Sequence, residues 1–273
     1  MKIAKGITIL IFLCSIAIWF YGKQEMKKQD VTPPVITSTI SELHVKAGAA
    51  DEALLKEGLT AFDDVDGDLT EQIIVGKISS FKEKGVSDVE YVVFDSGNNV
   101  GRYERTVYFE NYESPKLHLS KALVFEVNGK ILLSDRLTAT DMLEGDITDK
   151  IRFSSPNLVT SEEGTYRLNV EMKNSYGDTV KHQLPINLVR YNCDQERIQL
   201  REYLVYVKKG RTLIPENYIT AVIDRNGENV SFDQVKITND VNLTKPGIGQ
   251  IGYELLEGED VVYATYLTVI VTE

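Results

Sequence analysis

Four aspartates, Asp63, Asp64, Asp66 and Asp68, lie within six residues of one another. Carboxylate oxygens are ligands that Ca²⁺ prefers, so this density predicts a candidate calcium site. The spacing does not fit an EF-hand, because the twelfth position counted from Asp64 is Val75 and not a glutamate. A structural turn is the second interpretation, since aspartates accept hydrogen bonds from nearby backbone N–H groups and exposed carboxylates repel by only about 1 kcal/mol in water.

The other chemistry-bearing residues do not assemble into a catalytic set. His44, His118 and His182 stand at unrelated positions, whereas a zinc site needs three or four converging ligands. The nucleophile motif G-x-S-x-G does not occur in the sequence. We therefore expect no enzyme activity, no catalytic residue and no bound organic cofactor.

The two cysteines, Cys14 and Cys193, are far apart in the chain, and the first lies in an apolar N-terminal segment. We expect no disulfide between them, so the fold is not stapled. An unpaired Cys193 in an exported chain could instead form a disulfide with another molecule.

Charge excludes one class of partner. The net charge is -11, from 41 acidic and 30 basic residues, and no basic cluster occurs beyond the N-terminus. A duplex-binding face needs clustered Lys and Arg to displace counterions, so we expect no nucleic-acid partner.

The aspartate-rich turn belongs to a segment that recurs about every 80 residues. Residues 61–70, AFDDVDGDLT, return as residues 139–148, ATDMLEGDIT, and more weakly as residues 221–231, AVIDRNGENVS. Repetition at a fixed period indicates tandem units of one fold. The second copy keeps three acidic residues and the third loses the cluster. This loss favours the structural turn over the calcium site.

Each copy is followed by a pattern typical of two β-strands joined by a tight turn. A glycine (Gly85, Gly164, Gly247) opens the first strand, and apolar and polar residues then alternate. Gly, Asn and Asp residues between the strands suit a turn that needs positive φ. Because no long helical period is present, these patterns predict an all-β fold with one β-sandwich per repeat.

Residues 6–22 form an uncharged apolar run that would extend roughly 25 Å as a helix, just enough to cross a bilayer. A cleaved signal peptide is the competing interpretation, but residues 19–21, Trp-Phe-Tyr, provide none of the small residues that cleavage requires. We predict a membrane anchor at residues 1–28 and a linker at residues 29–34. The chain would then be a single-pass cell-membrane protein with its C-terminal domains outside the cell.

The repeats resemble the bacterial surface immunoglobulin-like repeat, which occurs in Gram-positive surface proteins and beside pesticidal crystal toxins. The resemblance covers most of residues 35–190 and implies an Ig-like β-sandwich, a surface location and no catalytic residues. The matching residues of the first repeat are Ala61, Asp63, Asp66, Gly67, Asp68, Leu69, Thr70, Gly85, Asp95, Gly97 and Asn98. Those of the second are Ala139, Asp141, Glu144, Gly145, Asp146, Ile147, Thr148, Gly164, Tyr166 and Gly177, and the third keeps only Ala221, Gly227 and Gly247.

The predicted architecture is therefore a series of tandem Ig-like β-sandwiches behind an N-terminal transmembrane helix. The repeats are expected at residues 35–111, 112–190 and 191–273, the last being divergent. We expect a structural spacer or a protein-interaction and adhesion stalk on the bacterial surface. A glycan-binding surface module is the alternative, because Tyr103, Tyr108, Tyr112 and Tyr191 fall where exposed rings could stack on sugars.

Overall fold

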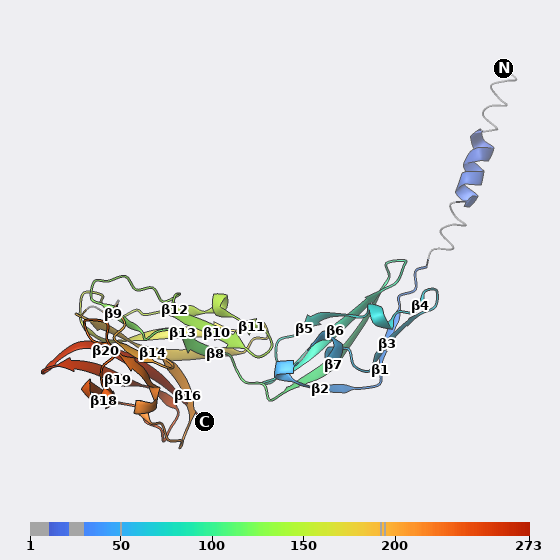
Figure 1. Cartoon of the computed structure of the whole chain (residues 1–273). Helices are drawn as coiled ribbons and strands as arrows, with labels where there is room; N and C mark the ends of the chain where they lie inside the picture. The colour runs from blue at the N-terminus through green and yellow to red at the C-terminus, as the bar shows by residue number, and fades with distance from the viewer. Residues whose placement is uncertain (1–10, 22–29, 50, 192, 194) are drawn as a thin grey trace. The chain divides into compact units, whose positions relative to one another are not determined.

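The structure is a computed structural model, and it describes residues 11–21, 30–49, 51–191, 193 and 195–273. Apart from short helical segments, the described residues form strands and the loops between them (Figure 1), which confirms the predicted all-β class. By packing, the chain separates into two compact units, Met1–Asn111 and Tyr112–Glu273.

The N-terminal segment does not meet the prediction made for it. Residues 11–21 are helical, and a helix over those residues covers roughly 16 Å, whereas the hydrocarbon core of a bilayer is about 30 Å thick. Among the described residues, no helix is long and apolar enough to cross a membrane. This finding contradicts the predicted transmembrane helix, the single-pass localisation and the membrane as a partner. The rest of the predicted anchor, residues 1–10 and 22–28, lies outside the described residues.

The first unit contains two sheets. One sheet is antiparallel, with the order β1-β3-β4: β1 (Val35–Ser38), β3 (Leu59–Asp63) and β4 (Gly67–Asp68). The other has the order β2-β7-β6-β5: β2 (Glu42–Lys46), β7 (Val100–Glu110), β6 (Val86–Phe94) and β5 (Ile74–Ile78). β2 runs parallel to β7, and the other pairs are antiparallel. The short helix α2 (Glu52–Leu55) and the 3-10 turns η1 (Ala47–Ala49) and η2 (Thr70–Gln72) connect the strands.

Alternation along the strands decides which residues enter the core of the first unit. In β3, Leu59, Ala61 and Asp63 are buried while the residues between them are exposed, as expected for a strand with one inward face. Tyr91 of β6 is fully buried, and its hydroxyl donates to the Leu55 carbonyl at 2.6 Å. Arg105 of β7 is also buried, and its guanidinium donates to the carbonyls of Leu55 and Glu57, at 2.8 Å each.

The second unit contains two further pairs of sheets built in the same way. The first pair has the orders β11-β10-β8 and β12-β13-β14-β9: β8 (Lys116–Leu119), β9 (Val124–Glu126), β10 (Leu137–Asp141), β11 (Gly145–Asp146), η3 (Thr148–Lys150), β12 (Arg152–Ser154), β13 (Gly164–Lys173) and β14 (Thr179–Val189). The second pair has the orders β15-β17 and β16-β20-β19-β18: β15 (Ile198–Leu200), β16 (Leu204–Lys208), η4 (Pro215–Tyr218), β17 (Ile219–Val222), η5 (Phe232–Gln234), β18 (Val235–Asn239), β19 (Gly247–Glu257) and β20 (Asp260–Thr272).

One frame recurs through both units. A long antiparallel hairpin (β6–β7, β13–β14 or β19–β20) adds a short early strand in parallel at its second arm. The same pairing in three segments confirms sandwich-like β-sheets in each predicted repeat. The exact domain bounds 35–111, 112–190 and 191–273 stay a prediction.

A single hydrophobic cluster fills the second unit. It includes buried residues from both of its sheet pairs, such as Leu117 and Ile186 from one and Tyr253 and Leu267 from the other. A buried amide hydrogen bond joins the same two parts, from Asn187 Nδ2 to Gln250 Oε1 at 3.2 Å. Residues 112–273 therefore share one continuous core.

Candidate cation site

The aspartate-rich turn lies between β3 and β4. Asp63 ends β3 on its buried face, and its Oδ1 accepts the backbone N–H groups of Val65 at 2.8 Å and Asp66 at 2.9 Å. Gly67 follows with φ of 77°, a conformation that glycine adopts without the steric cost of a side chain. One oxygen of Asp63 therefore holds the turn, as the structural interpretation expects.

Thr70 ties the end of this turn back to β3. Its hydroxyl accepts the N–H of Ala61 at 3.1 Å, while the N–H of Leu69 donates to the Ala61 carbonyl at 2.9 Å. The same two bonds recur in the second repeat, at Thr148, Ile147 and Ala139. The alanine and threonine of the repeated motif thus close the turn in both copies.

The β6–β7 hairpin turn brings a further aspartate to this turn. Asp66 Oδ2 accepts the N–H of Ser96 at 2.8 Å, which links the two turns directly. Asp95 begins the hairpin turn and accepts the N–H of Asn99 at 2.7 Å and its Nδ2 at 2.8 Å. The two turns come from different sheets of the first unit.

The segment before β1 adds a fourth aspartate. The carbonyl of Asp30 accepts Asn99 Nδ2 at 3.2 Å, and its Oδ1 accepts the N–H of Thr32 at 2.9 Å. A glycine allows this segment to lie against β7, because a Cβ at Gly101 would sit 2.2 Å from the Pro34 carbonyl oxygen. The close approach at Gly101 therefore holds Pro34 against β7, and the Asn99 amide holds Asp30.

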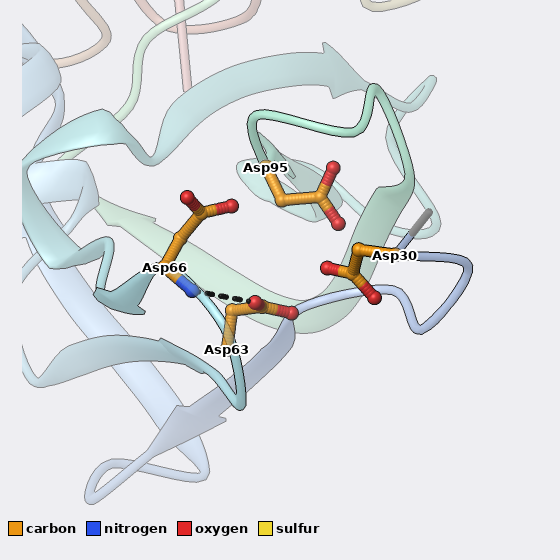
Figure 2. Close-up of side chains that lie close together, drawn as sticks. All are labelled: Asp30, Asp63, Asp66 and Asp95. Atoms are coloured by element: carbon orange, nitrogen blue, oxygen red, sulfur yellow. Dashed lines mark hydrogen bonds between the residues drawn. The ribbon is translucent and has the colours of Figure 1, made fainter. Parts of the chain in front are cut away.

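Together Asp30, Asp63, Asp66 and Asp95 form what we call the carboxylate cluster (Figure 2). Each contributes one oxygen, and these four oxygens all lie within 4.8 Å of one another. Asp63 is 2% exposed and Asp95 is 6% exposed. Oδ2 of Asp30 and Oδ2 of Asp63 are buried and have no hydrogen-bond partner. Among the described residues, no Lys, Arg or His forms an ion pair with any of the four.

This environment differs from the solvated turn that the sequence suggests. Two ionised carboxylates at 4.8 Å repel by about 3.5 kcal/mol at an effective dielectric constant of ~20, compared with about 1 kcal/mol in water. A hard cation between them would replace repulsion by attraction. Two oxygens bound to Ca²⁺ at about 2.4 Å each can be no more than ~4.8 Å apart, and the cluster meets that limit.

The structure brings together two of the four aspartates predicted as ligands. Asp63 and Asp66 belong to the carboxylate cluster, whereas Asp64 and Asp68 lie outside it. Asp68 instead holds the backbone: its Oδ1 accepts the N–H of Thr70 at 2.9 Å, and hydrogen bonding from Thr70 lowers the pKa of Asp68. Asp30 and Asp95 were not predicted. Calcium binding itself stays a prediction.

The second repeat contains the same turn with different neighbours. Asp141 corresponds to Asp63, and its Oδ1 accepts the N–H groups of Leu143 at 2.9 Å and Glu144 at 3.1 Å. Its other oxygen has partners, because Asn174 Nδ2 donates to Asp141 Oδ2 at 3.1 Å and Tyr112 Oη lies 3.0 Å from it, sharing its one proton between Asp141 and Asp178 Oδ2 at 3.1 Å.

Two further positions distinguish the repeats. Asn174 begins its hairpin turn as Asp95 does, so an amide replaces a carboxylate.

Glu144 accepts the N–H of Ser175, as Asp66 accepts that of Ser96, but Glu144 is also paired with the ammonium of Lys150. The first repeat has Gln72 where the second has Lys150. The second repeat therefore satisfies its acidic side chains with its own donors.

The third repeat keeps the turn aspartate alone. Asp224 Oδ1 accepts the N–H groups of Asn226 at 2.8 Å and Glu228 at 2.9 Å. Glu257, at the end of β19, pairs with Arg197 and with Arg225, which follows Asp224 in the turn. This copy joins its turns through arginine.

The four tyrosines considered for glycan stacking and the cysteine considered for a disulfide are all at least half-buried. Tyr112 is buried and Tyr103, Tyr108 and Tyr191 are half-buried, so none of the four presents a fully exposed ring. Cys193 is half-buried, with its Sγ 4.0 Å from the Val124 carbonyl oxygen. The disulfide between molecules stays a prediction.

No family model matches the chain. Pesticidal crystal protein Cry22Aa of Bacillus thuringiensis is 28% identical over 164 residues, which are 58% of this chain and 22% of that protein. The chain thus spans about a fifth of that relative's length. This similarity agrees with the resemblance of the repeats to those found beside crystal toxins.

Two solved structures can be compared. A Clostridium perfringens ZmpB structure of CBM51-2 with GlcNAc and INT domains is 16% identical, with a TM-score of 0.23 over 55% of this chain and 26% of that chain. Drosophila N-cadherin EC1-3 is 12% identical, with a TM-score of 0.30 over 87% of this chain and 99% of that chain. The sandwich fold is established by the sheet pairings above and not by these low scores.

Proposed function

We propose that the chain is a non-catalytic β-sandwich module of the bacterial surface immunoglobulin-like type, acting as a structural spacer or protein-interaction stalk. One observation carries this proposal. Asp63, Asp141 and Asp224 each use a carboxylate oxygen to accept two backbone N–H groups of their own turn. The repeated acidic residues therefore build turns that connect strands, and the repetition serves the frame.

A repeated frame with variable turns suits a spacer or interaction role. The pairing of strands is the same in three segments, while the turns between them differ in charge and in hydrogen bonding. Loops on a rigid scaffold are the usual place for partner contacts. The 28% identity to a pesticidal crystal protein over 58% of the chain supports the family assignment.

Glycan binding is the alternative, and one surface feature of the second repeat favours it. A hollow of about 470 Å³ lies over β12, β13 and β14. Phe153, a residue that is 46% exposed, lines it, and aromatic rings stack on apolar faces of ligands. The polar lining residues include Arg152, Asn169, Glu171, Lys181 and Gln183.

The test measures binding of the full chain to isolated Gram-positive cell envelopes. Three envelope samples are compared: untreated, protease-treated and periodate-treated. Retention that protease abolishes and periodate preserves supports an interaction stalk, and no retention supports a spacer. Retention that periodate abolishes, and that Phe153→Ala also abolishes, establishes the glycan alternative. Release of soluble envelope fragments by the chain would overturn the non-catalytic proposal.

A further inference from the structure

We infer that the carboxylate cluster binds one Ca²⁺ ion, which ties the segment before β1 to the turns of both sheets in the first unit. This inference does not depend on the spacer or interaction role. The ligands are carboxylate oxygens of Asp30, Asp63, Asp66 and Asp95, with water completing the six to eight oxygens that Ca²⁺ takes.

An unpartnered buried oxygen indicates a missing ligand. Asp63 is 98% buried, and its Oδ2 has no hydrogen-bond partner although Oδ1 of the same carboxylate accepts two N–H groups. Buried polar atoms in native proteins nearly always have a partner. Asp30 Oδ2, from a segment far away in the sequence, is buried and unpartnered in the same cluster.

The second repeat shows what happens when no ion is needed. There the matching oxygen, Asp141 Oδ2, accepts a hydroxyl and an amide, from Tyr112 and Asn174. The acidic residue that matches Asp66 is Glu144, which pairs with the ammonium of Lys150. The first repeat has the carboxylate of Asp95 where the second has Asn174, and the neutral amide of Gln72 where the second has Lys150. A cation from solution would therefore do there what the chain's own donors do in the second repeat.

The type of ligand selects calcium among common cations. All four side chains offer hard carboxylate oxygens and none offers sulfur or imidazole nitrogen, which disfavours zinc and copper. Mg²⁺ usually takes one or two protein carboxylates and keeps several waters, whereas Ca²⁺ accepts more carboxylates in irregular geometry. Four converging aspartates fit Ca²⁺.

The ion would connect three separate parts of the first unit. Asp63 and Asp66 flank the turn after β3, Asp95 begins the β6–β7 turn, and Asp30 precedes β1. Without the ion, the Asp30 segment is held by the hydrogen bond from the Asn99 amide to the Asp30 carbonyl and by the close approach of Pro34 to Gly101. Calcium binding should therefore stabilise the first unit and order residues 30–34.

The experiment titrates CaCl2 into the chelator-treated full chain by calorimetry, followed by thermal unfolding and hydrogen exchange. We expect one binding site per chain. With calcium in roughly hundred-fold excess over Kd, the unfolding temperature of the first unit should rise by about 10 °C or more. Amide exchange in the peptide covering residues 30–38 should slow, and the unfolding of residues 112–273 should not shift.

The decisive variant is Asp63→Asn. It keeps the Oδ1 acceptor for the turn and removes the unpartnered oxygen and the charge, so the variant should fold and lose calcium binding at least ten-fold. Asp30→Asn lies outside the sheets, so it tests the same site without risk to the sandwich. The matched controls are Asp141→Asn in the second repeat and Asp64→Asn beside the cluster, and both should bind Ca²⁺ like the parent chain.

Two results would overturn the existence of the site, and a third would overturn the choice of ion. One is no binding heat and no shift in unfolding temperature with CaCl2. The other is an equal loss of affinity in Asp64→Asn and Asp63→Asn, because that would show a general attraction of cations to an acidic loop. An equal response to MgCl2 would reject calcium as the selected ion.

Discussion

The two oxygens of Asp63 have different roles at the residue scale. Oδ1 accepts two backbone N–H groups and closes the turn, while Oδ2 of this member of the carboxylate cluster is buried without a hydrogen-bond partner. Asp141 has the same Oδ1 bonds, but its Oδ2 accepts two side-chain donors. The two repeats thus share the local turn but differ in the surroundings of the aspartate, and the difference lies in the partners of its Oδ2.

Replacing a turn glycine should lower the free energy of unfolding through backbone conformation alone. Gly67 and Gly145 have φ of 77° and 73°, and a Cβ at either would meet nothing within 4 Å. We expect Gly67→Ala to lower the free energy of unfolding of the first unit by about 1 kcal/mol, because an L-residue is strained at positive φ. Urea unfolding measures this change, with Gly145→Ala as the matched variant in the second unit. A cost several times larger would mean that the turn makes contacts beyond its backbone.

Burial of His182 should make the second unit sensitive to acid. Its Nε2 is buried without a partner, and desolvation lowers the pKa of His182 from 6.5. The unfolded chain therefore binds more protons below pH ~6.5 than the folded chain does, so stability is full above that pH and falls as the pH drops toward the folded pKa. We expect His182→Gln to reduce the decrease in unfolding temperature between about pH 7 and 5.

The control for this prediction is His118→Gln. His118 belongs to the same unit but is exposed, where it hydrogen-bonds Thr140 Oγ1 at 2.9 Å. The pH dependence should be nearly unchanged in this variant. Equal effects of the two substitutions would show that burial at position 182 is not the cause.

At the scale of elements, the β3–β4 turn is joined to the β6–β7 turn, and the matching turns of the second repeat are joined in a similar way. In the first repeat the turns meet through Asp66 and Ser96, and in the second through Glu144 and Ser175. The second version adds Lys150 from η3 and an amide from Asn174. The difference between a cluster that needs a cation and one that does not lies in a few side chains on the same backbone.

This comparison predicts a graft. The double variant Gln72→Lys with Asp95→Asn places the ammonium and the amide of the second repeat into the first. We expect the first unit to become at least as stable as the calcium-saturated parent chain, with an unfolding temperature that no longer responds to CaCl2. Calorimetric unfolding with and without calcium measures this. Single substitutions are the controls, and Asp95→Asn alone should weaken binding without supplying a charge; a calcium response that survives in the double variant would contradict the mechanism.

At the scale of the whole molecule, residues 112–273 should unfold as one body. They share one hydrophobic cluster, in which Leu267 is fully buried. We expect Leu267→Ala to lower the free energy of unfolding of this unit by about 3 kcal/mol, through lost burial and a cavity. The predicted second and third repeats should lose stability together, while the calcium-responsive transition of the first unit stays in place.

Calorimetry and hydrogen exchange check this prediction. Leu132→Ala, at an exposed position of the same unit, is the matched control and should change the transition little. Loss of protection in residues 191–273 alone, with residues 112–190 unaffected, would mean that the shared cluster does not couple the two parts.

The sequence allowed the strands and turns to be predicted but not the neighbours across the sandwich. Alternation in residues 86–94 and 164–173 predicted strands because a strand exposes every second side chain to the same face. Arg105 is buried and bonded to carbonyls of a distant segment, and nothing in its local pattern indicates this. The N-terminal prediction failed because it rested on apolar composition, and the described helix is too short to cross a membrane.

The features that the sequence alone established are therefore local: the all-β class and the repeated turn. The burial of Asp63 and Asp141 at the ends of β3 and β10 was not predicted, because the carboxylates of this turn were expected to be exposed. The strand class and the repeated turn follow from the spacing of residues along the chain, because covalent geometry converts that spacing into the direction of each side chain. The carboxylate cluster was decided by tertiary structure alone. Asp30, Asp63 and Asp95 are brought within ligand distance of one another by strand register, by the stacking of two sheets and by the close approach of backbone at Gly101, and none of these is encoded in the spacing of neighbouring residues.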